Sequence, residues 1–360
     1  MTASILFSYD IFAEQQYGGI SRYFAELHRG LLDRNRDSWI VTGVHVNEYI
    51  RGLPHVLGIP VPPSRLGPIR VMGARAASFA LERALLARLG RSTIYHKTYY
   101  GPQRPPSRVP VVLTVYDMIH ELFPQSFSSS DPTRERKKHW CERADLILAI
   151  SQKTKDDIVA ILGTDPAKIV VTPLAAAPAA PSGGTSPPAY FLYVGDRRGY
   201  KNFRRTAEAF ARAKLGDATL VCYGGGGLTT DEQSFLDGLG IRARVSQTGG
   251  SDGDLARFYR DAIAFVHPSE YAGFGIPPLE AMAQGCPVIC STGGSIPEVC
   301  GDAVAYVAPT DVDALAAAMT TLATTPSERT RLSTLGRARC ALYSWARTVE
   351  LTMAAYDRLA

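Results

Sequence analysis

Short runs of apolar and β-branched residues recur along this chain, and amphipathic segments of helical period separate them. In the first half these runs lie at residues 4–11, 39–46, 93–98, 110–117, 145–151 and 169–174. In the second half they lie at residues 190–196, 219–225, 244–249, 262–269, 287–292 and 303–308. Apolar runs that alternate with helices are typical of parallel strands buried on both faces. The pattern therefore predicts an α/β protein built on parallel sheets.

A stretch at residues 172–190, rich in Pro, Ala, Gly and Ser, interrupts the alternation. This composition cannot build a core and is typical of a linker, and a chain of 360 residues is longer than one ordinary domain. We therefore predict a first doubly wound domain, a linker, a second doubly wound domain and a C-terminal helical segment, at residues 1–175, 176–189, 190–343 and 344–360. Ligands of such sheets bind beyond the carboxyl ends of the strands, so the loops there are candidate sites.

The composition narrows the class of protein. Hydrophobic residues make up 46% of the chain and charged residues 20%, which is typical of soluble globular proteins. No apolar run approaches the ~18 residues of a membrane span, and the first residues lack the pattern of a signal peptide. The six cysteines form no CxxC pair and have no zinc spacing. We interpret them as reduced thiols of a cytoplasmic protein.

A double glycine, Gly18 and Gly19, follows the first predicted strand and begins a helix that carries Arg22 in its first turn. Glycine lets backbone N–H groups approach an oxyanion, and a helix N-terminus favours negative charge. We therefore predict contact with a phosphate or a substrate at this turn. An ordinary glycine-capped turn is the alternative.

Basic residues follow the first predicted strand of the second half. Arg197, Arg198 and Lys201 come at the carboxyl end of that strand, just before a helix begins. Arginine can hold a diphosphate with two parallel hydrogen bonds, and lysine neutralises it as a point charge. We predict this function for Arg197 and Lys201, whereas Arg198 fits a solvated turn.

The segment 269–288 combines glycines, prolines and one carboxylate at the start of a helix. Gly275 keeps the backbone bare, so the amides there, including that of Ile276, can face a phosphate. Pro277 fits the first helical positions, because the N–H groups of those positions have no partner within the helix. Glu280 would repel a phosphate, but it can accept hydrogen bonds from two neighbouring hydroxyls, as on a ribose. A glutamate that only interacts with the helix dipole is the alternative.

Four blocks, at residues 17–24, 150–158, 193–203 and 267–289, resemble the retaining glycosyltransferases of family 4, and among them bacterial polysaccharide and O-antigen mannosyltransferases. The resemblance covers nearly the whole chain, with the blocks in the family's order and spacing. It implies the GT-B fold, in which two doubly wound Rossmann-like domains face each other across a cleft. It also implies a nucleotide-diphosphate sugar donor bound mainly by the second domain, with neither a metal nor another cofactor.

The resemblance also assigns roles to residues. It implies that Arg197 and Lys201 hold the diphosphate and stabilise the leaving group, as the main catalytic residues. It implies further donor contacts from the backbone at Gly275–Pro277 to the diphosphate and from the Glu280 carboxylate to the ribose. Thr248 and Gly249 would lie near the base. The loop at Gly18 and Gly19 would close over the diphosphate and the acceptor, and the C-terminal helix would return to the first domain.

The chain departs from the family pattern at one position. The pattern has two glutamates separated by seven residues, of which the first contacts the donor sugar. Counting back from Glu280 places that position at Ala272, whereas Glu270 lies two residues too early. Either the loop redirects Glu270, or the contact with the sugar is absent; we favour its absence, because a shift of two residues moves a side chain by several ångströms.

Polar side chains follow two predicted strands of the first half. They are His96 after one strand and Asp117, His120 and Glu121 after the other. Such groups can orient or deprotonate an acceptor hydroxyl. We predict that Asp117 and His120 are catalytic, and that His96, Glu121 and Arg22 contact the acceptor. A structural role is the alternative for both histidines.

The positive charge of the chain is concentrated in one part of the first half. The net charge is +5, and residues 64–108 carry nine basic residues but one acid, Glu82. Residues 65–91 form a predicted amphipathic helix with arginines on it. This helix fits either domain packing with a solvated basic face or docking to anionic lipid headgroups at the inner face of the cytoplasmic membrane. Residues 64–91 contain a single aromatic residue, Phe79, so the interleaved aromatics that stack on bases are absent, which argues against a nucleic-acid partner.

The resemblance predicts a retaining, metal-independent hexosyltransferase. Its donor would be a nucleotide-diphosphate sugar, in the first place GDP-mannose. Its acceptor would be a glycan or lipid-linked glycan in the synthesis of a cell-surface polysaccharide such as lipopolysaccharide. Two alternatives stay open: a nucleotide-sugar epimerase of the same fold, which needs no acceptor, and a non-catalytic module that binds anionic lipid. A dinucleotide oxidoreductase is excluded, because neither first-strand loop holds GxGxxG.

Overall fold

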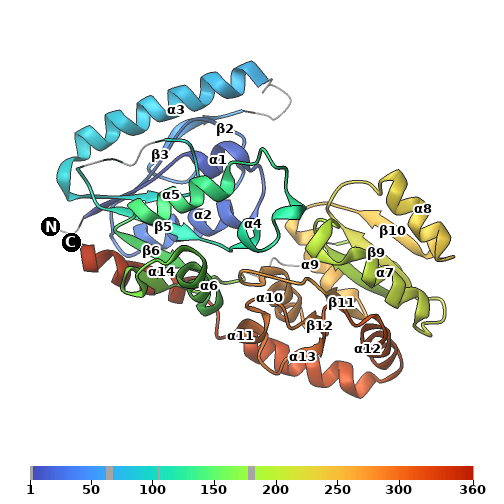
Figure 1. Cartoon of the computed structure of the whole chain (residues 1–360). Coiled ribbons are helices and arrows are strands. Elements are labelled where there is room, and N and C mark those ends of the chain that lie inside the picture. Colours follow the sequence, from blue (N-terminus) through green and yellow to red (C-terminus); the bar gives the residue numbers. More distant parts are fainter. Residues whose placement is uncertain (1–2, 62–67, 104–105, 107, 177–182, 360) are drawn as a thin grey trace. The chain divides into compact units, whose positions relative to one another are not determined.

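The computed structural model of the chain describes residues 3–61, 68–103, 106, 108–176 and 183–359, and these form two compact units (Figure 1). The first unit comprises Met1–Glu121, Ser128–Leu174 and Trp345–Ala360. The second comprises Leu122–Phe127 and Ala175–Ser344. Residues 177–182 of the expected linker lie outside the described residues. The sequence did not predict that Leu122–Phe127 belongs to the second unit, where the Phe123 ring lies 5.4 Å from that of Tyr200.

The described residues of the first unit form a seven-stranded parallel sheet of order β3-β2-β1-β4-β5-β6-β7. Its strands are β1 Ser4–Phe7, β2 Ser38–His45, β3 Val56–Pro60, β4 Thr93–Lys97, β5 Val111–Val115, β6 Leu146–Ala149 and β7 Ile169–Val171. The apolar runs of the first half predicted every one of these strands except β3. This edge strand escaped prediction because it is only partly buried and contains both Gly58 and Pro60.

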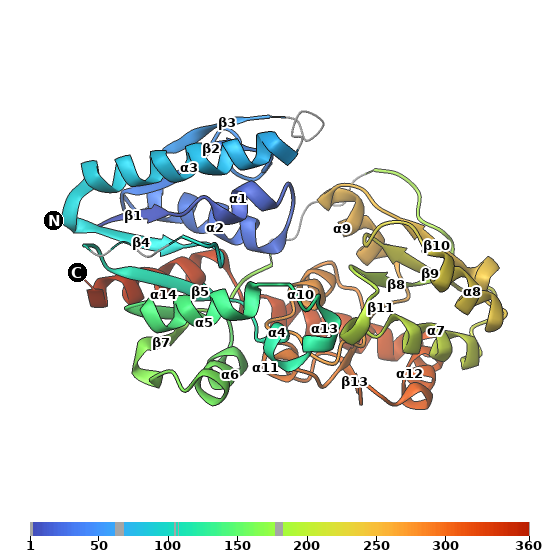
Figure 2. The same cartoon turned by 45° about the horizontal axis from the view of Figure 1, so that its top comes forward.

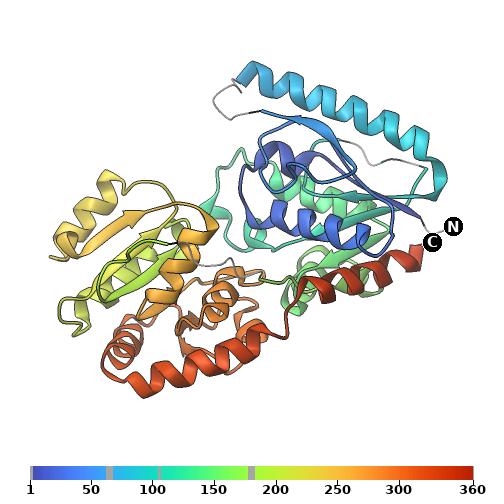
Figure 3. The ribbon, with the colours of Figure 1, turned by 180° about the vertical axis from the view of Figure 1, so that it is seen from behind.

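Helices cover both faces of this sheet. They are α1 Asp10–Glu14, α2 Gly19–Leu32, α3 Pro68–Leu89, α4 Ile119–Leu122, α5 Thr133–Arg143, α6 Gln152–Leu162 and α14 Trp345–Tyr356. Side chains of β4 alternate between the faces: the Tyr95 hydroxyl donates to Glu82 of α3, 3.0 Å away, whereas the His96 ring lies against Phe24 of α2. Figure 1 shows α5 on one side of the sheet, and Figure 3 shows α2 on the other.

The C-terminal helix α14 belongs to the first unit. The Thr348 hydroxyl donates to the Pro173 carbonyl over 2.7 Å, and Arg36 pairs with Asp357 just beyond the helix at 3.1 Å. Gly30 of α2 allows close packing, because a Cβ added there would lie 2.5 Å from the Val349 side chain. The final helix therefore packs on α2 and on the segment after β7, and its Tyr356 hydroxyl bonds to the ring of His96 in β4 at 2.6 Å.

The described residues of the second unit form a six-stranded parallel sheet of order β10-β9-β8-β11-β12-β13 (Figure 2). Its strands are β8 Tyr190–Val194, β9 Thr219–Tyr223, β10 Val245–Thr248, β11 Ala264–His267, β12 Val288–Ser291 and β13 Ala305–Val307. All six coincide with the apolar runs of the second half. The strand order reverses between β8 and β11, so the loops after these two strands lie where a doubly wound sheet binds its ligand.

Helices α7 Phe203–Arg212, α8 Thr230–Gly238, α9 Asp252–Asp261, α10 Ile276–Ala283, α11 Ile296–Cys300, α12 Val312–Thr324 and α13 Pro326–Cys340 cover this second sheet. Buried apolar residues of β8, β9, β11, α7 and α12 form one core cluster, and Figure 2 shows α7 and α12 side by side. All six cysteines lie within the described residues and are buried, unbridged thiols. Both units are doubly wound, which confirms the predicted α/β fold class.

Candidate active site

The loops after β8 and β11 meet at the switch point of the second sheet. After β8, the Tyr193 hydroxyl donates to the carbonyls of Asp196 and Lys201, at 2.8 and 3.1 Å, and so fixes the turn between them. Asn202 adopts a left-handed conformation at the start of α7, with φ of 60°. Its side-chain amide donates to the Pro268 carbonyl, 2.8 Å away in the loop after β11. The fold thus joins the segment that carries Lys201 to the loop that leads to α10.

Arg197 is buried, and its guanidinium contacts the neighbouring loop after β9. Its Nε donates to Glu232 at 2.9 Å, and its Nη atoms donate to the carbonyls of Gly224, Gly226 and Gly227 at 3.2, 3.0 and 2.8 Å. These bonds give Arg197 a structural explanation, because they shape a loop of glycines at the edge of the sheet. Its predicted contact with a diphosphate stays a prediction.

Lys201 and Arg198 differ in their surroundings. The Arg198 side chain is 86% exposed and pairs with Asp196 two residues earlier, which fits the solvated turn expected for it. Lys201 is partly buried, with its ammonium 5.1 Å from the centre of the Tyr200 ring. Burial, and then the positive charge of Lys201, lower the pKa of His267 at the end of β11 to about 3. Lys201 therefore lies beside a neutral imidazole at the switch point.

Helix α10 begins at the same edge, as the glycines and prolines predict. Gly275 is its N-cap, with φ of 107°, and a Cβ there would lie 2.8 Å from Ile296. Ile276 and Pro277 occupy its first two positions. Glu280 is the fifth residue of the helix, and its charge, after burial, contributes to the raised pKa of Tyr259. Among the described residues, the buried Tyr259 hydroxyl has no hydrogen-bond partner.

The loop that leads to α10 is held by the loop after β12. The Ser295 backbone N–H donates to the Ala272 carbonyl at 2.9 Å, and the Ser295 hydroxyl donates to the Phe274 carbonyl at 2.8 Å. Gly293 allows this approach, since a Cβ there would lie 2.2 Å from the Glu270 carbonyl oxygen. Hydrogen bonds and close packing within the second unit thus hold the backbone around the helix start.

Ala272 and Glu270, the two residues at the departure from the family pattern, both lie within the described part of the structure. Ala272 is buried, with 8% of its surface exposed. The Glu270 carboxylate accepts a hydrogen bond from Arg205 of α7, and its backbone N–H donates to the Tyr200 carbonyl at 2.8 Å. Glu270 and Arg205 line a cavity of about 640 Å³. In the described structure, the Glu270 carboxylate is thus engaged by an arginine of its own unit.

Thr248 and Gly249 lie at the carboxyl end of β10. The Thr248 carbonyl accepts from the backbone N–H of Gly224 at 2.9 Å, so this strand end adjoins the glycine loop held by Arg197. Space around Gly249 is open, with nothing within 4 Å of an added Cβ. The predicted position of the base is therefore next to the β9 loop.

In the first unit, Asp117 and Glu121 meet at a buried lysine that the sequence analysis missed. Asp117 follows β5, and its carboxylate accepts from the Ile119 backbone N–H at 3.2 Å. Lys137 of α5 donates to the Asp117 carbonyl at 2.9 Å and to the Glu121 carboxylate at 2.8 Å. The spacing of Lys137 with the buried Trp140 was the available signal, because it places Lys137 on the inner stripe of α5.

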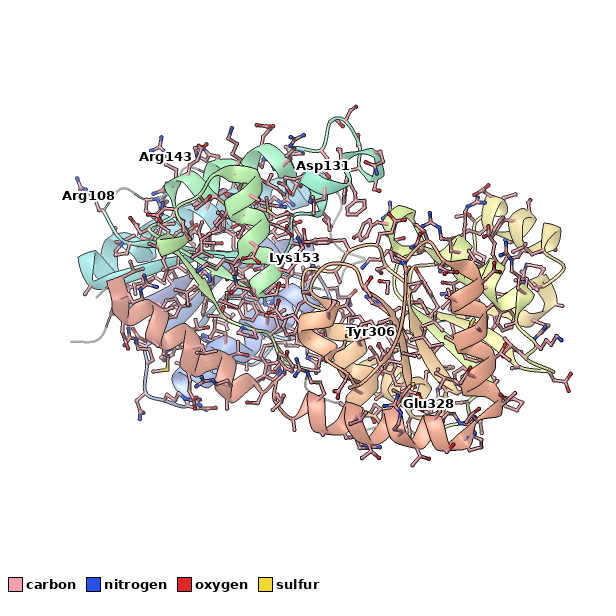
Figure 4. All side chains as sticks on the ribbon, turned by 60° about the horizontal axis from the view of Figure 1, so that its bottom comes forward. Arg108, Asp131, Arg143, Lys153, Tyr306 and Glu328 are labelled. Carbon is pink, nitrogen blue, oxygen red and sulfur yellow. The ribbon has the colours of Figure 1, made fainter. Side chains whose placement is uncertain are left out.

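The two candidate histidines lie in different surroundings. His120 Nε2 is 3.8 Å from the carboxylate of Asp131, and burial, followed by the charge of Lys137, lowers the pKa of His120. Figure 4 labels Asp131 on the segment before α5. His96 is fully buried: its ring nitrogens bond to the hydroxyls of Tyr356 at 2.6 Å and Thr114 at 2.8 Å. Burial lowers the pKa of His96 to about 3, and these contacts favour the structural alternative for it.

The double glycine begins α2, with Gly18 as the N-cap and Gly19 as the first helical residue. A Cβ on Gly18 would lie 2.2 Å from the Gln15 side chain, whose oxygen accepts from the Ser21 backbone N–H. The close approach of the Gln15 side chain is thus a local reason for glycine at position 18. The Arg22 guanidinium lies 6.0 Å from the centre of the Tyr49 ring. Donor or acceptor contact at this turn stays a prediction.

A second buried lysine, also missed by the sequence analysis, is the last residue of β4. Lys97 donates to the carboxylate of Asp10 at 2.6 Å and to the Gln103 side chain at 2.7 Å, and lies 4.5 Å from the centre of the Trp140 ring. Glu82 of α3 is buried nearby, and its burial raises its pKa to about 7. Charged side chains therefore support the carboxyl edge of the first sheet from inside.

The predicted basic helix corresponds to α3. Its buried side chains include Glu82, Leu85 and Leu86, while Arg75, Leu81 and Arg88 are among the exposed ones. Residues 65–67 and the side chains at 68–72, 74 and 91 lie outside the described part of the structure. Across the described helices, none combines the length and the apolar character needed to span a bilayer.

Comparisons with known proteins agree with this architecture. Residues 17–176 match the model of Glycosyltransferase Family 4, and residues 180–339 match that of Glycosyl transferases group 1. The O-antigen chain mannosyltransferase B of Escherichia coli is 30% identical over 282 residues, which cover 72% of this chain and 74% of that protein. The MMP alpha-(1->4)-mannosyltransferase of Mycolicibacterium hassiacum is 37% identical over 131 residues, which cover 35% of this chain and 32% of that protein.

Solved structures share the fold over the whole chain. Sucrose-phosphate synthase from Thermosynechococcus elongatus superposes with a TM-score of 0.78 at 21% identity, covering 100% of this chain and 99% of that one. HepE of Anabaena, solved with UDP and glucose, superposes with a TM-score of 0.69 at 17% identity, covering 98% of both chains. The chain therefore belongs to the GT-B glycosyltransferases, with a family 4 region followed by a group 1 region.

Proposed function

We propose that this glycosyltransferase moves a mannosyl residue from GDP-mannose to a glycan or lipid-linked glycan during synthesis of a cell-surface polysaccharide. The observation that carries the proposal is the similarity to the Escherichia coli O-antigen chain mannosyltransferase B, which extends over 74% of that protein. The Mycolicibacterium hassiacum relative is also a mannosyltransferase. These relatives favour a transferase over an epimerase or a non-catalytic lipid-binding module.

In the proposed donor site, the diphosphate lies at the switch point of the second sheet. Lys201 neutralises it, and the backbone at Gly275–Pro277 meets it at the start of α10, where a helix favours negative charge. Glu280 accepts from the ribose hydroxyls, and Thr248 lies near the base. Electrostatic stabilisation of the departing diphosphate is then the main contribution of this unit to catalysis.

The proposed reaction retains the configuration at the anomeric carbon, as the family resemblance implies. The acceptor oxygen forms a bond to the anomeric carbon while the bond from that carbon to the diphosphate breaks. The hydroxyl proton passes to the leaving phosphate, and Asp117 and His120 orient the acceptor. The Asp117 side chain is 27% exposed, so its carboxylate is accessible to a hydroxyl. Protein side chains, rather than a metal, supply the positive charge that stabilises the negatively charged leaving group.

A cytoplasmic enzyme with a lipid-linked acceptor would meet it at the membrane surface. We propose that the exposed face of α3, which carries Arg75, Leu81 and Arg88, contacts anionic lipid headgroups there. Sedimentation with liposomes tests this: binding to vesicles that contain phosphatidylglycerol but not to neutral vesicles is expected. Equal binding to both vesicles would contradict the proposal.

The donor and the reaction are tested in two steps. A thermal-shift panel of GDP-, UDP- and dTDP-sugars is expected to show the largest stabilisation with GDP-mannose. Incubation of the enzyme with GDP-mannose and a mannose-terminated oligosaccharide is then followed by mass spectrometry. Release of GDP together with an acceptor one hexose heavier supports the proposal. An isomerised donor would point to an epimerase, and an unchanged donor would point to a non-catalytic module.

A further inference from the structure

A buried cation at the carboxyl edge of the first sheet has no place in the proposed reaction so far. Lys137 lies on α5, and none of its side chain is exposed. Most polar residues of α5 face solvent, including Lys138, whereas Lys137 shares the inner stripe with Trp140 and Cys141. A lysine on an apolar stripe loses its hydration, and only close partners compensate for that loss. Its partners therefore indicate what it does.

Those partners are two of the candidate acceptor-side residues. The ammonium of Lys137 donates to the Asp117 backbone carbonyl at 2.9 Å and to the Glu121 carboxylate at 2.8 Å, and it lies 3.8 Å from the Asp117 carboxylate. It also lies 5.5 Å from the centre of the Tyr100 ring. One side chain thus joins the end of β5 to the first helix that follows it.

The two carboxylates differ in accessibility. The Glu121 side chain is 2% exposed, so an acceptor bound at the surface does not reach it directly. The Asp117 side chain is 27% exposed. Because the lysine bonds to the Glu121 carboxylate and, at Asp117, to the backbone carbonyl, it neutralises the buried acid, while the Asp117 carboxylate stays 3.8 Å away and partly exposed.

We propose that Lys137 is a positioning residue for the acceptor side: it holds Glu121 as an internal counter-ion and fixes the backbone at Asp117, so that the Asp117 carboxylate meets the acceptor hydroxyl. The proposal rests on the proposed function, since Asp117 is taken to orient the acceptor. It assigns Glu121 an indirect role, which differs from the direct contact predicted from the sequence. Removal of Lys137 leaves the buried Glu121 without its counter-ion and frees the turn after β5.

The test compares Lys137→Met, Glu121→Gln, the double variant and Lys138→Met with the wild-type enzyme. Lys138 is a matched control, because it has the same charge and lies on the same helix but is exposed. Amide hydrogen exchange reports the position of the turn directly, since the Ile119 N–H donates to the Asp117 carboxylate. We expect exchange at residues 117–121 to be about tenfold faster in Lys137→Met, with the other strands of the first sheet unchanged. Lys138→Met is expected to exchange like the wild type.

Kinetics with GDP-mannose as donor and methyl α-mannoside as acceptor reports the consequence. We expect kcat/KM for the acceptor to fall about 100-fold in Lys137→Met, because a displaced orienting group removes the alignment of the reactants. The Kd of GDP, measured by calorimetry, is expected to stay within about twofold, since the donor site is built by other residues. The double variant is expected to recover about tenfold of the loss, because it no longer buries an unpaired carboxylate.

Each outcome decides one question. A Lys137→Met variant that matches Lys138→Met in exchange and in kinetics would overturn the inference, and so would a double variant that recovers nothing. If Lys137→Met does not fold, the double variant replaces it, and faster exchange at residues 117–121 is still required. A wild-type enzyme that transfers nothing from GDP-mannose would overturn the proposed function, while the exchange comparison would still decide whether Lys137 positions Asp117.

Discussion

The two sheets of this enzyme present carboxyl edges of different construction. In the second unit the edge is largely backbone: carbonyls of a glycine loop surround Arg197, and Gly293 lies against the loop that leads to α10. In the first unit the edge rests on buried charged side chains, in which Lys97 pairs with Asp10 and Lys137 pairs with Glu121. The two edges therefore depend on different interactions for their shape.

This difference determines what each edge tolerates. A backbone-built edge keeps its shape when surface side chains change, but any added Cβ at a close approach displaces it. In an edge built from buried ion pairs, loss of one charge leaves its partner buried and unpaired. Substitutions at the two edges should therefore impair the enzyme in different ways.

The largest effect is expected for Lys201→Ala in the second unit. If the ammonium neutralises the departing diphosphate, its loss should lower the rate of mannosyl transfer by about 1000-fold at saturating substrates. The melting temperature should stay near the wild-type value, since the side chain is only partly buried. Arg198→Ala is the matched control, because Arg198 is a cation of the same turn with an exposed side chain. Equal rates in the two variants would remove Lys201 from the proposed donor site.

A somewhat smaller effect is expected for Gly293→Ala, which tests the backbone construction alone. The added Cβ would lie 2.2 Å from the Glu270 carbonyl oxygen, so the loop that leads to α10 must move. We expect transfer to fall about 100-fold, together with weaker binding of GDP in calorimetry. Gly238→Ala is the control, because nothing lies within 4 Å of a Cβ added there. Unchanged GDP affinity in Gly293→Ala would show that this loop does not shape the donor site.

The contrast between the edges also explains what the sequence could reveal. The strands of the second sheet and the start of α10 were predictable, because apolar runs, glycines and prolines act locally on the backbone. The position of Lys201 at a strand end followed from the same local rules. Gly275 and Pro277 do occupy the helix start that their conformational preferences indicate.

The supporting side chains could not be predicted in the same way. Lys137 contacts Glu121, sixteen positions away, and Lys97 contacts Asp10, from which it is separated by the helices α2 and α3 and the strands β2 and β3. Such pairs depend on which distant segments the sheet brings together. The neighbouring sequence does not indicate that a charged residue will be buried. Likewise, the composition around Arg197 indicated a diphosphate but not that its guanidinium bonds to the β9 loop.

A moderate, pH-dependent effect is expected for His96→Gln in the first unit. Burial lowers the pKa of His96 from 6.5 to about 3. Between these values the unfolded chain binds a proton that the folded protein does not, so the stability of the wild type rises with pH by about 1.4 kcal/mol per pH unit from this group. His96→Gln should lower the slope of the unfolding free energy against pH by about 1.4 kcal/mol per pH unit over this range, which corresponds to about one bound proton. Denaturant unfolding at a series of pH values measures it.

The control for this experiment is His139→Gln, since His139 is exposed on α5. A slope that is equally reduced in both variants would indicate that the effect does not arise from the burial of His96. A slope unchanged in His96→Gln would show that His96 takes up a proton in the folded state, against the surroundings that the structure gives it. The result would thereby distinguish a structural histidine of the first sheet from a residue that contacts the acceptor.

The smallest effect is expected for Glu270→Gln, at the departure from the family pattern. The Glu270 carboxylate bonds to Arg205, and both side chains are about one-third exposed, at 31% and 34%. An ion pair this exposed contributes little stability, so its loss should leave the fold of the second unit intact. We therefore expect the transfer rate to change by about threefold or less. The preference for GDP-mannose over other GDP-hexoses should not change if Glu270 does not touch the sugar, and competition between two donors in one reaction measures this. A change in donor preference would instead place the Glu270 carboxylate at the sugar. It would also show that a side chain at the edge of the second sheet contributes to the selection of the donor.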